Sequence, residues 1–384
     1  MKASVWLSRI TVAIFSLLIV SLGALTLVLP KKEYSEEENR YLQSAPVLSA
    51  EAVFSGKYMK ELGSFVSDHV PFRDLLLLEK CESERFLGRA ENNHVLFGKN
   101  GYLIKRLEWR EDKTFRESIS GAVNLVRTLE EHGVPSTLVC APRAIDVLIR
   151  YLPENYPKNG TKGLTAFLRE HAEGALFPAE LLAEKVANCE QVFFRTDHHW
   201  TPLGAYYIYE MLGKTMCYTP LSLSDFDAEV ATESFVGTSA SAVLARNVTP
   251  DRIVRYRYRG DDALTVTDMT TGEVERGLYR DKFLNEKDKY ASFLGGNFAH
   301  LRITGGDDRP RLLMVKDSYA NCLVPFLARH YDIDLIDLRY IRGDAPAFLA
   351  DLLTSVEFDT ALLLFNVQSL SDGVGLAPFA QNIP

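Results

Sequence analysis

The chain has few cysteines, and none of them form a C-x-x-C pair. Only five are spread over 384 residues, and this spacing excludes a zinc knuckle. An odd number leaves at least one thiol unpaired, and five thiols are too few for a disulfide scaffold in a chain of this length. We therefore expect them to be mostly small buried apolar residues. The cysteines are Cys81, Cys140, Cys189, Cys217 and Cys322.

The chain also lacks an excess of basic residues. Its formal net charge is −8, and no run of Lys and Arg interleaved with aromatic residues occurs. A protein that binds nucleic acid would show a basic face, so we expect no nucleic-acid partner. Hydrophobic residues make up 47% of the sequence, which is enough to build the core of one large domain or two smaller ones.

Beyond the N-terminus, the sequence has no second uncharged run long enough to cross a membrane. Lys2 and Arg9 precede the run "ITVAIFSLLIVSLGALTLVLP", whose length suits a membrane-spanning helix. No A-x-A-like cleavage site closes it, which favours an uncleaved anchor over a signal peptide. A buried core helix is the third alternative. We predict that residues 1–32 are an anchor or signal segment and that the rest of the protein is an extracytoplasmic part of a single-pass cell-membrane protein.

The next segments predict a linker and then a helical start to the folded part. Residues 33–51 are charged and lack an apolar period, so we predict a linker there and one domain over 52–384. Apolar residues recur at helical spacing over 52–89, and Pro71 divides this stretch into two predicted helices. The sequence "HVLFGKNGYLIKR" at 94–106 is typical of a hairpin with "KNG" as its turn.

The remaining chain alternates between helix-like and strand-like stretches. We predict helices over 114–134, 161–187 and 204–216, and a β-rich insertion over about 222–305. Short apolar strands are predicted at 136–142, 191–197, 311–320, 332–339 and 360–368. Such alternation is typical of an α/β fold with a mostly parallel sheet covered on both faces. The expected class is therefore a three-layer α/β/α domain.

Two predicted strand ends carry polar residues that suit chemistry, and "QVFFRTDHHW" is the first. Asp197 and His199 are two residues apart, so on an extended chain they share one side while His198 points to the other. A carboxylate beside an imidazole fixes its tautomer and stabilises its charged form, as a general base requires. A polar strand end with no catalytic role remains an alternative. A metal site would need further ligands, and we expect no metal or cofactor.

The second strand end is "RLLMVKDSYA", where Ser318 follows the apolar run. A serine at a strand-to-helix turn can expose its hydroxyl to a substrate, although a serine in this place is also a common helix N-cap. Because active groups in such sheets gather beyond the carboxyl ends of the strands, Ser318 can meet His199 and Asp197. Nearby loops offer hydrogen-bond donors for an oxyanion. The candidates are Gly295, Gly296, Asn297 and, in a second loop, Asn366.

These motifs together resemble a known family. "TDHHWTPLGA", "FVGTSASA", "FLGGN" and "KDSYAN", preceded by "FSGKYMKELGSFVSDHVPFRD" and "ENNHVLFGKNGYLIKR", resemble the DHHW proteins in the same order. Through them the chain is similar to the alginate O-acetyltransferases, whose fold is SGNH-hydrolase-like. The resemblance implies that Asp197 orients the base His199 and that Ser318 is the nucleophile. It further implies that Trp200 and Tyr319 support the site.

The function that this resemblance implies is an O-acetyltransferase of the cell envelope. It would pass an acetyl group from a donor to Ser318 and then to an extracellular polysaccharide or glycan. A membrane-bound O-acyltransferase is the implied partner, because acetyl donors are made inside the cell. Two alternatives stay open: a carbohydrate esterase that uses the same three residues with water as acceptor, and a non-catalytic envelope protein that binds a glycan or serves as a scaffold.

Overall fold

The structure is a computed structural model, and it describes residues 2–35, 37–38, 40–106, 109–157, 161–245, 247–306 and 308–380. The chain divides into two compact units. The first comprises Met1–Arg89 together with Ser241–Asn247, and the second comprises Ala90–Ala240 together with Val248–Pro384. The compact unit that contains the large sheet begins at Ala90. The domain start at residue 52, expected from the sequence, stays a prediction.

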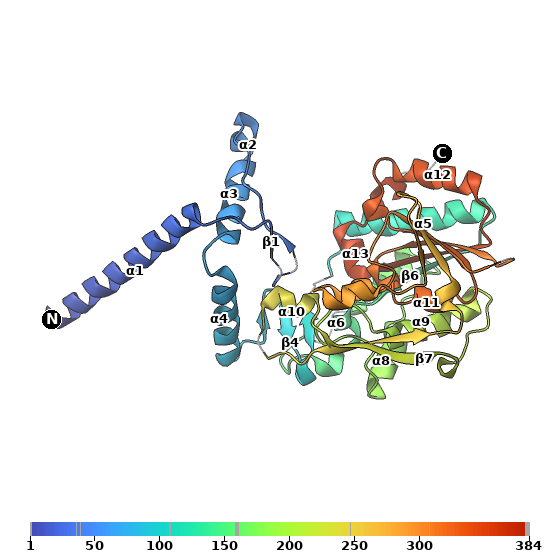
Figure 1. Ribbon diagram of the computed structural model, residues 1–384, viewed down its shortest axis with the longest axis horizontal. Coiled ribbons are helices and arrows are strands. Elements are labelled where there is room, and N and C mark those ends of the chain that lie inside the picture. The colour runs from blue at the N-terminus through green and yellow to red at the C-terminus, as the bar shows by residue number, and fades with distance from the viewer. Residues whose placement is uncertain are drawn as a thin grey trace. The chain divides into compact units, whose positions relative to one another are not determined.

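The first unit is mainly helical (Figure 1). The two helices on either side of Pro71 are separate, as the sequence predicts. Proline has no N–H and restricts the conformation of the residue before it, so a helix does not continue through it. A short antiparallel β pair lies inside the segment predicted as a linker. The elements of this unit are α1 (Lys2–Val28), β1 (Tyr34–Ser35), β2 (Arg40–Tyr41), α2 (Ala50–Phe54), α3 (Lys57–Asp68) and α4 (Arg73–Phe86).

Helix α1 contains a membrane-length apolar stretch. Its segment Val5–Val28 is long and apolar enough to cross a bilayer, and its most apolar 18-residue window has no buried residue. An apolar helix that no protein core covers is suited to lipid. The helix therefore has the character of a membrane anchor or a signal sequence, as the sequence predicts.

The second unit begins with the predicted hairpin. Strands β4 (Val95–Phe97) and β5 (Leu103–Lys105) pair antiparallel, and β3 (Glu91–Asn92) joins them at the edge. The turn between them contains Asn100 at φ 56° and Gly101 at φ 78°. Asn and Gly are the residues that tolerate this left-handed region, which explains why "KNG" marks the turn.

A seven-stranded mixed sheet forms the centre of the second unit, with the strand order β10-β9-β11-β13-β12-β14-β6. The strands from β13 to β6 run parallel, whereas β10, β9 and β11 pair antiparallel with their neighbours. The mixed α/β class predicted from the sequence is thereby confirmed. The strands are β6 (Ser136–Ala141), β9 (Thr265–Asp268), β10 (Val274–Arg276), β11 (His300–Thr304), β12 (Arg311–Lys316), β13 (Asp332–Ile336) and β14 (Thr360–Asn366).

Apolar side chains cover both faces of the parallel strands. Along β12, Leu313 and Val315 face one hydrophobic cluster, while Leu312 and Met314 face the other, as expected for a strand buried on both sides. The first cluster includes residues of α5 (Lys113–Glu131), α7 (Thr161–His171), α12 (Ala345–Ser355) and α13 (Val367–Asp372). The second includes residues of α6 (Ala144–Val147), α8 (Ala179–Ala187), α9 (Pro202–Thr215) and α11 (Val324–Leu327). Figure 1 shows α5 and α12 above the sheet and α8 and α9 below it.

The region predicted as a β-rich insertion has two parts. Strands β7 (Asp227–Phe235) and β8 (Asp251–Arg257) pair with each other in a separate two-stranded sheet. Strands β9, β10 and β11 instead extend the central sheet. The helix α10 (Thr238–Val243) lies between β7 and β8 in the chain. The predicted β-rich insertion did not specify that the strands of this region belong to two sheets.

Residues 191–197 do not form the predicted strand. Val192, Phe193 and Phe194 are buried, but the segment turns back on itself: Phe193 forms an antiparallel bridge with Trp200. Phe194 N–H donates to the carbonyl of His199 at 3.2 Å, and Thr201 N–H donates to that of Val192 at 2.9 Å. The apolar run indicated burial, which a buried loop shares with a strand.

The cysteines are all free thiols. Cys81, Cys140 and Cys322 are buried, as predicted, whereas Cys189 and Cys217 are exposed. The two exposed cysteines have positive φ values of 64° and 58°, each directly after a helix. Both therefore occupy helix-ending positions rather than core positions.

Candidate active site

Ser318, His199 and Asp197 form one chain of hydrogen bonds. His199 Nε2 lies 2.8 Å from Ser318 Oγ, and His199 Nδ1 lies 2.6 Å from Asp197 Oδ1. Because an ionised carboxylate only accepts, Nδ1 carries the proton and Nε2 is free to accept from the serine hydroxyl. The structure thus brings together three residues from two segments that are 119 positions apart at the His199–Ser318 contact.

The loop that carries Asp197 and His199 is held by a buried carboxylate. Asp251, only 1% exposed, accepts the N–H of Arg195 at 3.0 Å and that of Thr196 at 2.8 Å. It also accepts the Thr196 hydroxyl at 2.7 Å and the Gln191 amide at 2.9 Å. The Asp251 carboxylate thus accepts the backbone N–H groups of the loop, which in a strand would donate to the carbonyls of a neighbouring strand. Nothing in the sequence near Asp251 signalled this role.

Asp197 is buried and has several donors besides the imidazole. Its carboxylate accepts the backbone N–H of His199 at 2.9 Å and that of Thr238 at 2.8 Å, and the Thr238 hydroxyl at 2.9 Å. Burial by itself would raise the pKa of Asp197, but the charges and hydrogen bonds of His198 and His199 outweigh it and lower the pKa well below its usual value. Asp197 therefore stays ionised and keeps the Nδ1 proton of His199 in place.

Gly237 allows the Asp197 side chain to lie where it does. A Cβ at position 237 would lie 2.3 Å from Asp197 Cβ and 2.5 Å from its Oδ2. No side chain fits at these distances, so the "FVGTSASA" segment needs a glycine here. The motif was noticed in the sequence as part of the family pattern, but the reason for its glycine is visible only in the fold.

Ser318 follows strand β12, and its neighbour Asp317 caps the short 3₁₀ helix Ser318–Ala320. The Asp317 carboxylate accepts the Tyr319 N–H at 2.9 Å and the Asn366 N–H at 2.6 Å. The alternative that Ser318 is itself the helix cap is therefore wrong. Since Asp317 serves as the cap, the half-buried Ser318 hydroxyl is left to bond His199.

Tyr290 is a site residue that the sequence did not reveal. Its ring stacks on the His199 imidazole, with 4.0 Å between centroids and an interplanar angle of 11°. Its hydroxyl donates to the Ser318 carbonyl at 3.0 Å. One side chain thus contacts both the imidazole and the backbone of the serine, which restricts the orientation of each. A tyrosine in a loop carries no periodic signal that marks such a role.

Trp200 and Tyr319, the two expected support residues, link the histidine loop to the serine turn. The Trp200 indole N–H donates to the Tyr319 carbonyl at 2.8 Å, and the two rings pack edge to face at 5.1 Å. The Tyr319 hydroxyl donates to the His198 carbonyl. These contacts tie the histidine loop to the serine turn directly, so they fix the spacing between base and hydroxyl.

The loop Gly295–Asn297 lies beside the serine turn. Gly295 and Gly296 have φ values of 90° and 108°, which favour glycine, and their N–H groups donate to the carbonyls of Ala291 and Phe293. The two glycine amides are therefore engaged inside the loop and are not free oxyanion donors. What the glycines provide is the turn that presents Asn297.

A buried lysine orients the Asn297 side chain. Lys316 Nζ donates to Asn297 Oδ1 at 2.9 Å and to Asn321 Oδ1 at 2.8 Å, and lies 3.7 Å from the Asp337 carboxylate. Because an ammonium group only donates, the Asn297 oxygen must face Lys316 and its NH₂ group must point elsewhere. Burial lowers the pKa of Lys316 to about 8 despite the nearby Asp337.

His198 does not point away from His199, contrary to the expectation from an extended strand. In the tight turn, the two imidazole centroids lie 3.8 Å apart. His198 Nδ1 lies 2.7 Å from the Thr238 hydroxyl oxygen, and that hydroxyl donates to Asp197, so Nδ1 of His198 donates. Burial, followed by the charge of His199, lowers the pKa of His198 to about 4, and this ring is neutral at physiological pH.

Asp197, His198 and His199 also offer metal-ligand atoms within 4.8 Å of one another. Metal binding requires unprotonated imidazole nitrogens. In this network both Nδ1 atoms carry protons that they donate, and Nε2 of His199 accepts from Ser318. A metal and the Ser318 hydroxyl would therefore compete for Nε2 of His199.

Asn366 is not available as an oxyanion donor. Its side-chain NH₂ donates to the carbonyls of Ala141 and Pro142, at 3.0 and 3.2 Å, and its side-chain oxygen accepts the Gln368 N–H at 2.9 Å. Both ends of the amide are thus used to join the ends of β14 and β6. The second candidate loop from the sequence is structural.

Comparison with known proteins agrees with the motifs. Residues 171–336 match the family model described as DHHW protein. The chain resembles the DHHW proteins. This resemblance, predicted from the sequence, is confirmed, and the matched stretch contains all three residues of the hydrogen-bond chain.

Curated relatives of this DHHW-like chain include two probable alginate O-acetylases AlgJ. That of Pseudomonas putida is 29% identical over 118 residues, which cover 29% of this chain and 31% of the relative. That of Pseudomonas syringae pv. tomato is 26% identical over 168 residues, which cover 42% of this chain and 43% of the relative. The chain thus matches less than half the length of these relatives.

Solved structures share the fold. A DHHW family protein from Eubacterium siraeum superposes with a TM-score of 0.60 and 24% identity, covering 76% of this chain and 96% of that one. Bacillus cereus PatB1 superposes with a TM-score of 0.58 and 20% identity, covering 72% and 96% of the two chains. At these identities the likeness concerns the fold.

Proposed function

We propose that this protein is an O-acetyltransferase of the cell envelope that acetylates an extracellular glycan through Ser318, His199 and Asp197. The observation that carries the proposal is the unbroken hydrogen-bond chain from Ser318 Oγ through His199 to Asp197. This is the arrangement of a serine nucleophile with its base and orienting carboxylate. The similarity to alginate O-acetylases supports acetyl transfer to a polysaccharide. We infer further that the sheet is of the three-layer SGNH-hydrolase type.

The first half of the proposed reaction loads the acetyl group. His199 Nε2 takes the proton of Ser318 while Oγ attacks the acetyl carbonyl carbon of an ester or thioester donor. The bond between this carbon and the donor's leaving group then breaks, and the leaving group receives the proton from His199. The ionised Asp197 stabilises the imidazolium that forms in between. The product is an acetyl-serine at position 318.

The second half transfers the acetyl group to a sugar. A glycan hydroxyl gives its proton to His199 Nε2 as its oxygen attacks the acetyl carbon. The bond to Ser318 Oγ breaks, and Oγ regains a proton from His199. Water in place of the sugar would give acetate, which is the esterase reaction. In both half-reactions every proton and acetyl group that leaves one atom is accepted by another, so the proposed reaction needs no cofactor.

We expect two donors to stabilise the oxyanion of each step. The Tyr319 N–H is used by Asp317, but among the described residues the Ser318 N–H and the Asn297 NH₂ have no acceptor. Lys316 turns the Asn297 oxygen away and so leaves this NH₂ group free. Each oxyanion donor is worth about 10²–10³-fold in rate in enzymes of this kind.

The proposal also includes the surroundings of the enzyme. The apolar helix α1 suggests attachment to the membrane, with the second unit on the extracytoplasmic side. Because acetyl donors are made in the cytoplasm, we infer a membrane-bound O-acyltransferase as the partner that delivers the acetyl group. The glycan is the acceptor.

Ser318→Ala tests the proposal. The variant should lower turnover of an aryl acetate by about 10³-fold or more while its melting temperature stays near that of the wild type, because Asp317, not Ser318, caps the turn. His199→Ala should cost about as much, since the two residues act as one unit. Ser224→Ala, at an exposed serine, is the matched control and should keep full activity.

Product analysis separates the two reactions. With a soluble oligosaccharide present, mass spectrometry should find the acetylated sugar and, on a trapped intermediate, an acetyl group on the peptide that contains Ser318. Acetate alone as product would favour the esterase. A Ser318→Ala variant with wild-type activity toward acetyl esters and glycans would refute the enzyme and leave the non-catalytic envelope protein.

A further inference from the structure

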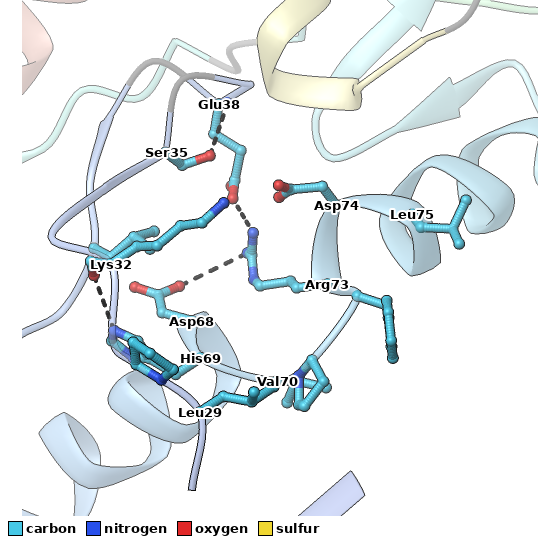
Figure 2. Close-up of a pocket in the computed structure, with 14 residues that line it drawn as sticks. Leu29, Lys32, Ser35, Glu38, Asp68, His69, Val70, Arg73, Asp74 and Leu75 are labelled. Atoms are coloured by element: carbon cyan, nitrogen blue, oxygen red, sulfur yellow. Dashed lines mark hydrogen bonds and ion pairs between the residues drawn. The ribbon is translucent and has the colours of Figure 1, made fainter. Parts of the chain in front are cut away.

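The turn between α3 and α4 lies against the segment that follows the apolar helix. A cavity of about 330 Å³ is lined on one side by Leu29, Pro30 and Lys32 and on the other by residues 68–75 (Figure 2). His69 Nε2 lies 3.1 Å from the Lys32 carbonyl oxygen. Since α1 ends at Val28, the turn lies only a few residues from the end of the apolar helix.

Ion pairs hold the turn in this place. Figure 2 shows Arg73 directed between Glu38 and Asp68; it pairs with Glu38 and lies 3.7 Å from Asp68. Arg40 forms two hydrogen bonds to the same Asp68, at 3.0 and 2.5 Å. The first turn of α4, the end of α3 and the segment after α1 are thus joined by partly buried charges. The α3–α4 turn therefore stays beside the exit of α1.

The same turn exposes large apolar side chains. Phe72 is 68% exposed, and Leu75 and Leu76 are each 50% exposed. Phe72 has a φ of 60°, a left-handed conformation that is unfavourable for a bulky residue, and it gains no burial in return. Exposed apolar residues that sit together mark an interaction surface.

We propose that Phe72, Leu75 and Leu76 rest in the interfacial layer of the bilayer from which α1 emerges. The extended chain covers only about 3.5 Å per residue, so the four residues from Val28 to Lys32 keep the turn near the membrane surface. Lys31 and Lys32 lie next to the apolar run, and Lys31 Nζ donates to the Thr26 carbonyl at the end of α1. Lysines at such a position keep their stems in apolar surroundings and their charged heads in the headgroup region. Aromatic and aliphatic side chains beside such a basic pair are typical of membrane-interface anchors.

The proposed contact is limited to this end of α4. Farther along the helix come Glu79, Glu82 and Glu84, whose charges oppose insertion. Phe86 lies at the opposite end of α4 and is also exposed, at 91%, about 20 Å from Phe72 along the helix axis. The two phenylalanines therefore form a matched pair at the two ends of one helix. This inference rests on α1 remaining in the membrane as proposed above.

Photo-crosslinking of the full chain in proteoliposomes tests the inference. Phe72→benzoylphenylalanine and Phe86→benzoylphenylalanine each keep an exposed aromatic ring, and a melting curve confirms folding. After irradiation, mass spectrometry should find lipid adducts on the residue-72 peptide at several times the yield on the residue-86 peptide. Adding Leu75→Glu to the first variant should reduce its lipid adduct several-fold, while the fraction of protein in the membrane pellet stays constant.

The other outcomes of this experiment would overturn either the inference or the anchor on which it rests. Equal yields at the two positions, or no adduct at residue 72 in membrane-bound protein, would overturn the inference without affecting the anchor. A discrete protein adduct at residue 72 would overturn it in favour of a membrane partner protein. Protein absent from the membrane pellet would instead refute the anchor itself, and ester turnover by the same sample reports on Ser318 independently.

Discussion

At the scale of single residues, the site depends on which atoms each imidazole uses. His199 has both nitrogens engaged, one with Asp197 and one with Ser318, and Tyr290 covers one of its faces. His198 lies against it but bonds Thr238 instead. The two adjacent histidines of the motif therefore have different surroundings: His199 connects Asp197 to Ser318, and His198 packs beside it in neutral form.

Tyr290 should act as a positioning residue for His199. We expect Tyr290→Leu to lower kcat by about 10–100-fold with little change in KM, because a loosened base loses orientation rather than substrate binding. Tyr290→Phe keeps the stacked ring and loses only the hydrogen bonds of the hydroxyl, to the Ser318 carbonyl and to Cys322 Sγ, so it should restore most of kcat. Steady-state kinetics on an aryl acetate measure the difference. A Tyr290→Leu variant with wild-type kcat would show that the stacking does not matter.

His198 should make stability depend on mildly acidic pH. Its pKa is lowered from 6.5 to about 4 in the folded protein, so between these values the unfolded chain binds a proton that the folded one does not. Stability from this group is therefore present above about pH 6.5 and is lost as the pH falls toward 4.

The variant His198→Gln isolates this contribution. Wild type should lose about 1–2 kcal/mol more stability than His198→Gln between about pH 7 and pH 5, a value reduced from the full shift because the ring is partly exposed. Denaturant unfolding at the two pH values measures it. Parallel losses in both proteins would mean that His198 is not held neutral.

At the scale of elements, the site is a junction of loops rather than of strands alone. The turn around residues 191–201 is held by Asp251 at the start of β8, and Asp197 accepts the N–H of Thr238 at the start of α10. The serine turn follows β12, in the middle of the parallel strands. The sheet thus positions Ser318, and residues from the β7–β8 region position the loop of Asp197 and His199.

Gly237→Ala tests this junction. The added Cβ would overlap Asp197, 2.3 Å from its Cβ, so Asp197 must move and His199 loses its orientation. We expect kcat/KM to fall by about 10²-fold, more than any loss of stability explains. Gly63→Ala in α3 is the matched control, because nothing lies within 4 Å of its added Cβ and alanine favours helices. Equal activity of both variants would contradict the proposed role of the contact.

At the scale of the whole molecule, the protein combines a helical unit, which includes the apolar helix α1, with a unit that carries the candidate site. We expect protease added to intact cells to degrade the second unit, because α1 should hold the protein at the membrane with this unit outside. Deletion of residues 2–28 should remove the protein from the membrane pellet. Recovery of an intact full-length chain from the cytosolic fraction would contradict both the anchor and the export.

Much of the fold follows from local pattern. The apolar runs predicted β6, β12, β13 and β14, helical spacing predicted α5 and α9, and "KNG" predicted the hairpin turn. These succeed because side-chain period and turn chemistry are set by neighbours in the chain. The motif residues Asp197, His199 and Ser318 could also be named, since their residue types and strand-end places are local properties.

The rest depended on contacts between distant segments. The apolar run at 191–197 indicates burial, but it does not show whether a sheet or a turn accepts the backbone hydrogen bonds of the segment. The prediction of a strand there was wrong, and it placed the His198 side chain on the wrong side. Asp251, Tyr290 and Lys316 act through partners far away in the chain, and Gly237 is required only because Asp197 lies against it. Local sequence order therefore specified the elements and the reactive groups. The positions of these elements relative to one another came from tertiary packing. The hydrophobic effect favours the removal of apolar area from water but is non-directional, so an apolar pattern does not specify which segments meet.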